Sequence, residues 1–388
     1  MLEKALTGGR GYWTWLVALV ALIAIGGAAW LRQLEIGLAV TGLGRDVSWG
    51  LYIAQFTFLV GVAASAVTVV LPYYLHDCKA FARVTILGEC LAVASVTACA
   101  LFILVDMGQP GRVLNVLLYP SPSSLMFWDM LSLGGYLIIN AVIAWVTLSA
   151  EHEDVPAPAW LRPVVLLSIP WAISIHTVTA FLYAGLPGRS FWMTAVLAPR
   201  FLASAFAAGP SLLIVLALLL RRVARFDVGR DAIQKLAVIV VYAMIANVFF
   251  LLMEVFTAFY SGIPEHVGHF QYLFAGLDGH GALVPWMWTS VALTLAGLAL
   301  LIVPRFRRNE SLLAVAAIAV FLALWIDKGL GLIVGGFVPT PFEHVVDYAP
   351  TAIEILISAG IWAIGALLVT VFYKIAIAVR HTDPAAAM

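Results

Sequence analysis

The chain has 388 residues, of which 63% are hydrophobic and 11% are charged, and its 21 basic and 21 acidic residues cancel to a formal net charge of zero. This composition excludes intrinsic disorder, which needs few hydrophobic residues and a high net charge, and the lack of a basic excess argues against nucleic-acid binding. A soluble fold of this size could not cover so much apolar surface, so the composition indicates a polytopic membrane protein.

Ten apolar segments are long enough to cross a bilayer core of about 30 Å, which needs roughly 20 helical residues. They are too long and too continuously apolar for barrel strands of about ten alternating residues. The first segment is also longer than the roughly 7–15 apolar residues of a signal peptide, so we expect it to be retained. The predicted fold is all-α, with one integral membrane domain over 1–388. Its ten predicted spans are 12–31, 49–74, 82–105, 125–149, 161–186, 199–220, 233–260, 285–303, 311–333 and 351–377.

The basic residues are unequally divided between the two sides of the membrane. An even number of spans puts both termini on one side, where we count fifteen Lys and Arg residues. The opposite side has five, namely Arg32, Arg45, Arg112, Arg189 and Arg200. By the positive-inside rule both termini are cytoplasmic, and the expected location is the inner (cytoplasmic) membrane of the cell. The opposite loops are longer and richer in Gly, Pro, Trp and His, so we expect the outer, periplasmic face to be the working one.

No motif predicts a cofactor bound by this chain. Haem held between helices needs intramembrane histidine pairs, and of the eight histidines only His176 lies deep in a span. The three cysteines fit no metal or iron–sulfur spacing, and no phosphate-binding GxxxxGK[ST] loop is present. The outer loop 261–284 contains His266 and His269, and we favour its interpretation as an ordinary polar loop. A metal site at these two histidines is the alternative. We therefore expect no haem, metal or nucleotide here, and any separate redox domain must belong to another chain.

Titratable residues inside the spans gather at one predicted depth. His176, Glu254 and Lys328, with Asp327 beside it, lie ten or eleven residues before a proline that marks the outer end of their helix. At 1.5 Å per residue they lie about 15–18 Å below the surface, near the midplane. Such groups are costly and usually functional, so we predict a proton path or ion site, with a structural hydrogen-bonded network as the alternative. Because Asp327 and Lys328 are adjacent on a helix, they should have different partners.

A second polar group is predicted near the outer surface, where the second, third and fourth helices begin or end. Asp129 lies one turn inside its span and needs a partner there. An interfacial tryptophan belt and helix-capping charges are the alternative explanation for the other members. A polar patch walled by aromatic rings suits a quinone, whose ring is flat and apolar and whose two oxygens need hydrogen-bond or proton donors. The members of this patch are Arg45, Trp49, Asp106, Arg112, Trp128 and Asp129.

Several stretches resemble the signature of a known family, including 44–50 (GRDVSWG), 106–110 (DMGQP), 121–129 (SPSSLMFWD), 175–179 (IHTVT) and 253–261 (MEVFTAFYS). They are similar to the NrfD/polysulfide-reductase membrane subunits. The ten-helix layout resembles the branch that includes DsrP, the quinone-interacting subunit of the DsrMKJOP complex of sulfur metabolism. The similarity covers most of residues 35–270. Gln109 stands where many members have arginine, so Arg112 or Arg45 would have to take that role.

The resemblance implies two four-helix bundles, at 49–186 and 199–333, with 12–31 and 351–377 as flanking helices. It implies that menaquinone or ubiquinone reacts as substrate in the first bundle, near the outer face. Electrons would pass to or from a periplasmic iron–sulfur subunit, and further cytochrome and membrane subunits would belong to the same complex. The expected function is thus quinone chemistry within a respiratory or sulfur-metabolism complex, coupled to proton translocation if the buried polar residues conduct protons.

This hypothesis assigns three roles to the predicted site residues. Proton exchange with the quinone oxygens falls to Asp129 and His176, since carboxylates and histidines can act as acids and bases. The residues that orient and wall the quinone are Arg45, Trp49, Asp106, Arg112 and Trp128. The residues that carry protons toward the cytoplasm, or else hold the second bundle together, are Glu254, Asp327 and Lys328. The alternatives are a secondary transporter such as an ion antiporter, which the midplane charges also suit, and a purely structural anchor for redox partners.

Overall fold

The computed structural model describes residues 2–380, and within that part of the chain the regular secondary structure is helical. Ten of the described helices are long and apolar enough to cross a membrane, which confirms the predicted all-α fold with ten spans. Their boundaries agree with the predicted ones to within five residues. The spans are α1 (Arg10–Ile36), α2 and α3 (Leu51–Ala63 and Ser65–Leu75), α4 (Thr85–Asp106), α6 (Leu125–Glu153), α7 (Leu161–Ala184), α8 (Leu197–Val223), α9 (Arg230–Ser261), α11 (Val284–Ile302), α13 to α14 (Glu310–Leu324 to Leu332–Phe337) and α15 (Ala352–Arg380).

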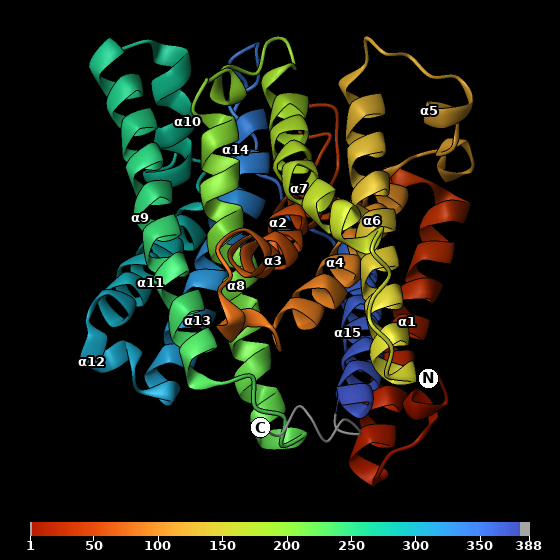
Figure 1. The fold of residues 1–388 in the computed structure, drawn as a ribbon. Helices are drawn as coiled ribbons and strands as arrows, with labels where there is room; N and C mark the ends of the chain where they lie inside the picture. Colours follow the sequence, from red (N-terminus) through yellow and green to blue (C-terminus); the bar gives the residue numbers. More distant parts are fainter. Residues whose placement is uncertain (1, 381–388) are drawn as a thin grey trace.

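The first and last spans meet the same side of the molecule. In Figure 1 the start of α1 and the end of α15 lie at the bottom, whereas α5 (Asn115–Leu118) and α10 (Pro264–Phe274) lie at the top. We call the bottom side the terminus face and the top side the far face. The far face is the one that the sequence predicts to be periplasmic.

Helix packing divides the spans into two groups that meet at α2. The first group is α2, α4, α6 and α7, and the second is α8, α9, α11 and α13. The flanking helices α1 and α15 pack along each other, and α15 also packs on α4. Because α2 is covered by α4 on one side and by α8 on the other, it is the most fully buried span, whereas α1 is largely exposed on the outside of the molecule.

Two spans are irregular within the membrane, although both are predicted from the sequence as continuous helices. The second span breaks at Ala64, between α2 and α3, where it packs against α8. The ninth span contains a π-helical segment, Trp325–Gly331, between α13 and α14. Single π-helical turns are rare in proteins, and those that do occur are often found at functional sites. The segment carries both Asp327 and Lys328, which places the two charges on irregular backbone.

The outer segment 261–284 contains more regular structure than predicted. A polar loop is predicted here from the sequence, but residues Pro264–Phe274 form α10. Pro264 stands at the first helical position, where its missing N–H group costs nothing and its fixed φ suits the helix. Gly262, with φ of 63°, ends the preceding span α9. The far face of the second bundle is therefore covered by a short helix rather than by a loop.

Candidate functional site

One face of α7 places three polar side chains inside the first bundle. His176, Thr179 and Tyr183 are three and four residues apart, so they lie above one another on the helix. The hydroxyl of Thr179 donates a hydrogen bond of 2.6 Å to Oδ1 of Asp129 on α6. The Tyr183 hydroxyl bonds with Thr57 on α2. Asp129 therefore has the partner that its burial requires, and α2, α6 and α7 meet around this polar group.

His176 lies one turn deeper along α7 than Thr179 and is completely buried. Among the described residues, neither of its ring nitrogens has a hydrogen-bond partner. A buried polar atom without a partner loses its hydration and gains nothing in return, at a cost of about 1–3 kcal/mol. Such a group calls for a functional explanation, and a substrate or proton that binds at this position would supply one.

The two tryptophans predicted to wall a quinone lie in different surroundings. Trp49 is partly buried and packs on other aromatic rings, with ring-centroid distances of 5.8 Å to Tyr183, 6.2 Å to Trp192 and 5.9 Å to Phe337. Trp128, on α6, is 44% exposed and donates its indole N–H to the Pro122 carbonyl of the preceding loop, at 2.8 Å. The structure therefore packs Trp49 against the core beside Tyr183 and leaves Trp128 at the surface.

The charged residues predicted around the outer patch are also separated. Arg45 and Arg112 are exposed, and within residues 2–380 neither forms an ion pair. Asp106 ends α4 with a buried Oδ1 that has no hydrogen-bond partner among the described residues. A basic residue that the prediction did not assign, Arg189, lies closer to the aromatic group. Its guanidinium is 4.3 Å from the Phe337 ring centroid and donates to the Phe337 carbonyl at 3.2 Å.

The second bundle holds a buried triad of Arg200, Glu254 and Asp327. The guanidinium of Arg200 donates to Glu254 at 2.7 Å and to both oxygens of Asp327 at 2.9 and 2.8 Å. From the sequence, Arg200 is counted with the basic residues of the outer side, at the start of its predicted span, but α8 already begins at Leu197 and the Arg200 side chain is 8% exposed, inside the bundle. The signal that could have found it is chemical: two intramembrane carboxylates require a buried cation.

Lys328 is not hydrogen-bonded to this triad and reaches Gly61 of the first bundle. Its ammonium donates to the Phe201 carbonyl at 3.4 Å and lies 4.3 Å from the Phe201 ring centroid. On the other side it faces Gly61 of α2, where a Cβ atom would lie only 3.1 Å from Nζ. Glycine at this position leaves room for the ammonium between the two bundles. Asp327 and Lys328 thus have different partners, as predicted.

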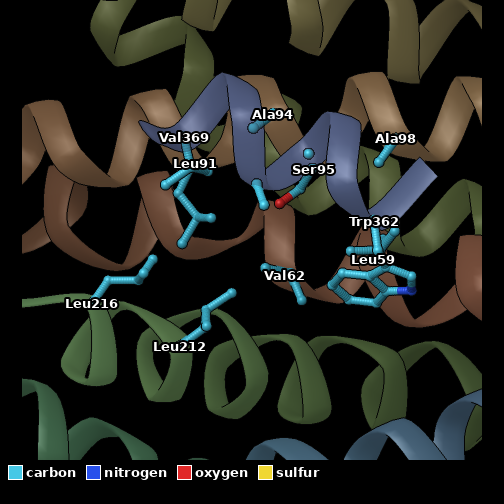
Figure 2. A pocket seen from close by; sticks show the side chains of 12 residues that line it. Leu59, Val62, Leu91, Ala94, Ser95, Ala98, Leu212, Leu216, Trp362 and Val369 are labelled. Carbon is cyan, nitrogen blue, oxygen red and sulfur yellow. The ribbon is translucent and has the colours of Figure 1, made fainter. Parts of the chain in front are cut away.

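An apolar groove of about 180 Å³ lies between α2, α4, α8 and α15. Figure 2 shows the side chains that line it, among them Leu59, Leu91, Leu212 and Trp362. Ser95 contributes the one hydroxyl-bearing side chain of this lining. The indole of Trp362 is held by the side-chain oxygen of Gln55, at 3.0 Å. The groove has the chemistry to accommodate a hydrocarbon chain.

One histidine of the far face, His269, has hydrogen-bond partners on both ring nitrogens. His269 is buried, with Nδ1 at 2.7 Å from the Gly335 carbonyl and 2.9 Å from the Val338 carbonyl, and with Nε2 at 3.0 Å from the Ser190 hydroxyl. Burial lowers the pKa of His269, and the carbonyl hydrogen bonds only partly oppose this shift. His269 thus fastens α10 to the end of the ninth span. Within residues 2–380, no group of three or more His, Cys, Asp or Glu side chains is placed to hold a metal ion.

Comparison with known proteins identifies the family. The family model "Polysulphide reductase, NrfD" matches residues 39–338, beyond the end of the similarity at 35–270 seen in the sequence. The chain belongs to the NrfD family. It is 28% identical over 94% of its length to a putative dimethyl sulfoxide reductase membrane subunit of Halobacterium salinarum, and it covers 90% of that protein.

Two further relatives are matched over shorter stretches. The chain is 23% identical to a selenate reductase subunit of Mesobacillus selenatarsenatis, over 52% of this chain and 54% of that one. It is 24% identical to the Hdr-like menaquinol oxidoreductase integral membrane subunit of Archaeoglobus fulgidus, over 63% of this chain and 60% of that one. The protein is therefore a multi-pass membrane subunit of the kind found in oxidoreductase complexes.

Proposed function

We propose that this NrfD-family protein exchanges electrons between membrane quinone and a partner iron–sulfur subunit, with the quinone reacting in the first bundle. The observation that carries the proposal is the buried polar group of that bundle. Asp129 is held by one hydrogen bond from Thr179, and His176, one turn away, has two ring nitrogens without partners among the described residues. One relative is named as a menaquinol oxidoreductase subunit, which supports quinol as the substrate class.

The chemistry assigned to these residues is proton exchange. When a quinol is oxidised, its two O–H bonds break, two electrons leave to the iron–sulfur partner and two protons leave to bases in the protein. Asp129 and His176 are those bases, each accepting one proton, and quinone reduction runs the same steps in reverse. Trp49 and Tyr183 supply aromatic surface beside them, and the apolar groove against α15 suits the isoprenoid tail. The two buried bases would thus handle both protons of one quinol.

The proposal extends to the setting of the protein. Both termini are cytoplasmic and the far face is periplasmic, in accordance with the basic residues of the loops. The iron–sulfur subunit docks on the far face, and further cytochrome and membrane subunits complete the complex. Placement in the DsrP branch, with a role in sulfur metabolism, belongs to this proposal and is supported by the ten-helix layout. Menaquinone and ubiquinone are both compatible with the site.

The test is quinol-dependent electron transfer in membranes that contain the whole complex, with Asp129→Asn and His176→Gln. Loss of a positioned acid–base group typically lowers a rate by about 10²–10⁴-fold, and we expect a decrease in that range for each variant. Asp154→Asn is the matched control. Asp154 is an exposed carboxylate on the terminus face with φ of 53°, a conformation that asparagine tolerates, so its rate should not change. Wild-type rates in both site variants, at equal amounts of assembled complex, would refute the assignment.

The transporter alternative has one structural feature in its favour, the π-helical segment at mid-span with its two charges. Interrupted helices of this kind form ion sites in secondary transporters. Membership in a family whose relatives are named as subunits of reductases and a menaquinol oxidoreductase favours the redox function. Purification distinguishes the two: iron–sulfur partners with bound quinone support the redox function, and ion flux by the chain alone in liposomes supports transport.

A further inference from the structure

A cavity of about 270 Å³, with a mixed polar and apolar lining, lies in the second bundle beside α10. We call it the far-side vestibule. It is bounded by the segment before α8, by α9 and by α10, and its polar lining comprises Ser190, Thr194, Glu254, Thr257 and His266. Its rim is accessible, because Met193 is 58% exposed and Thr257 is also exposed. The remaining lining residues are apolar, but the hydroxyl, carboxyl and imidazole groups offer hydrogen bonds that water can satisfy and lipid tails cannot, so we interpret the polar side of this cavity as hydrated.

Glu254 connects this vestibule to the buried triad. Since α9 runs from the terminus face to the far face, Glu254 is the deepest vestibule residue on that helix, about 10 Å below its end at Ser261. Its side chain remains 10% exposed, although it bonds Arg200 at 2.7 Å. The charged and titratable groups that face it are Arg200 from α8, Asp327 behind Arg200 and His266 from α10. Glu254 therefore contacts the cavity on one side and the ion network on the other.

A second, very small cavity continues on the inner side of the triad. Its volume is about 10 Å³, close to the space that one water molecule requires, and its lining includes Arg200, Asn247, Asp327 and Lys328. The side-chain oxygen of Asn247 is buried without a hydrogen-bond partner among the described residues. One water molecule here could accept from Lys328 and donate to Asn247. The polar groups thus continue from the vestibule past the triad to Lys328, which faces Gly61 of the first bundle.

We propose that the far-side vestibule admits water to Glu254, and that this carboxylate exchanges protons between the buried triad and the far side of the membrane. The proton on the Glu254 carboxyl passes to a vestibule water, and a proton from Lys328 reaches the triad through the small cavity. The inference deepens the proposed quinone function, because it gives the protons of the first bundle an exit. It reverses the direction expected from the sequence, in which these residues carry protons toward the cytoplasm.

Thiol labelling of the native complex tests water access. Thr257→Cys and Ala258→Cys place thiols on the vestibule wall, and Phe256→Cys places one at similar depth on the other, exposed side of α9. Ser123→Cys is the positive control in an exposed far-face loop. With a charged, membrane-impermeant thiosulfonate added to right-side-out vesicles, we expect at least tenfold faster labelling at the vestibule positions than at Phe256→Cys. A lipid-open groove would instead leave both vestibule positions unlabelled while Ser123→Cys reacts, and that result would overturn the proposal.

Infrared spectroscopy tests the proton exchange without any quinone. An acid step should change a carboxyl band that is missing in Glu254→Gln, and labelling of Thr257→Cys should slow this change at least tenfold. Labelling of Ser123→Cys is the control and should not affect the band. An unchanged rate in labelled Thr257→Cys would overturn the role of the vestibule. Since neither measurement uses quinol, the vestibule and the quinone site can fail independently.

Discussion

The two bundles bury ionisable groups in opposite ways. In the first, Asp129 has a neutral hydroxyl as its partner and His176 has no hydrogen-bond partner among the described residues. In the second, Arg200 binds two carboxylates at once through three hydrogen bonds. An isolated buried charge is very costly, whereas a paired and hydrogen-bonded one is tolerated. The first arrangement leaves its groups free to exchange protons. The second ties its charged groups to one another and holds helices together, with Glu254 as the member that also reaches the vestibule.

This difference teaches which residues should affect activity and which should affect assembly. A group without a partner contributes little to stability, so its removal should mainly impair chemistry. A member of a closed ion network is needed by its partners, so its removal should first impair folding. Helix α8 allows a direct comparison of a buried and a more exposed ion network, because it carries Arg200 within the membrane and Arg221 near its other end. Arg221 also binds two carboxylates, Asp227 and Glu310, but it is 21% exposed rather than 8%.

The largest predicted effect is that of Arg200→Met. This change leaves Glu254 and Asp327 buried without a cation, and breaking a buried pair in this way costs about 3–5 kcal/mol. We expect strongly reduced amounts of folded protein and a much lower melting temperature of the purified protein in detergent. Arg221→Met is the matched control and should cost no more than about 1 kcal/mol, because exposed pairs contribute little.

A triple variant separates lost charge balance from lost packing. Arg200→Met combined with Glu254→Gln and Asp327→Asn removes all three charges and should recover much of the melting temperature. Equal melting temperatures for Arg200→Met and Arg221→Met would contradict the distinction between the buried and the exposed network.

The fold could be predicted from sequence because the membrane leaves few choices. Hydrophobic length alone identifies spans, since every backbone polar group must be satisfied within its own helix. The π-helical segment at Trp325–Gly331 could not be predicted in this way, because hydropathy is insensitive to how the backbone hydrogen bonds are shifted. For the same reason the sequence predicts a loop where α10 forms: a helix of 11 residues with two histidines carries no membrane signal.

The candidate site could be predicted only in part. The rule that charges in spans are functional identified Asp129, His176, Glu254 and the pair in the ninth span. It missed Arg200, which stands at the predicted start of a span, where charges are ordinary. It could not separate Trp49 from Trp128 either, since both are tryptophans at a predicted helix end. Which way each ring points is decided by tertiary packing against Trp192 and Phe337, and no local pattern records that packing.

A smaller effect is expected at the aromatic contact that joins the two bundles. The buried ring of Trp192 stacks on Trp49 and donates its indole N–H to the Leu332 carbonyl at 2.9 Å. A Cβ atom at Gly336 would lie only 2.0 Å from this ring. Gly336→Ala should therefore displace Trp192 and destabilise the protein by about 1–3 kcal/mol, as overpacking of a core does.

Thermal melting in detergent measures this effect, and Gly134→Ala is the control because a Cβ atom there meets nothing within 4 Å. Trp192→Phe in the Gly336→Ala background should recover part of the loss, since the smaller ring relieves the clash. No difference between Gly336→Ala and Gly134→Ala would show that Trp192 is not held against this helix.

The smallest predicted effect concerns Asp227, which lies in the aqueous loop after α8. Burial raises the pKa of Asp227, but hydrogen bonds from the Gly229 N–H and from Arg221, together with the charge of Arg221, outweigh burial and hold this pKa below its ordinary value. A carboxylate with a lowered pKa stabilises the fold fully above its unfolded pKa of about 3.9, and this contribution is lost as the pH falls through the folded value. Asp227→Asn should therefore cost no more than about 1 kcal/mol at pH 7, and less in high salt. The difference in melting temperature from wild type should shrink steadily below pH 4.

Raised salt should leave the effect of Arg200→Met on the melting temperature nearly unchanged, because buried pairs are screened much less than exposed ones. An equal salt dependence of Asp227→Asn and Arg200→Met would contradict the burial of the Arg200 triad.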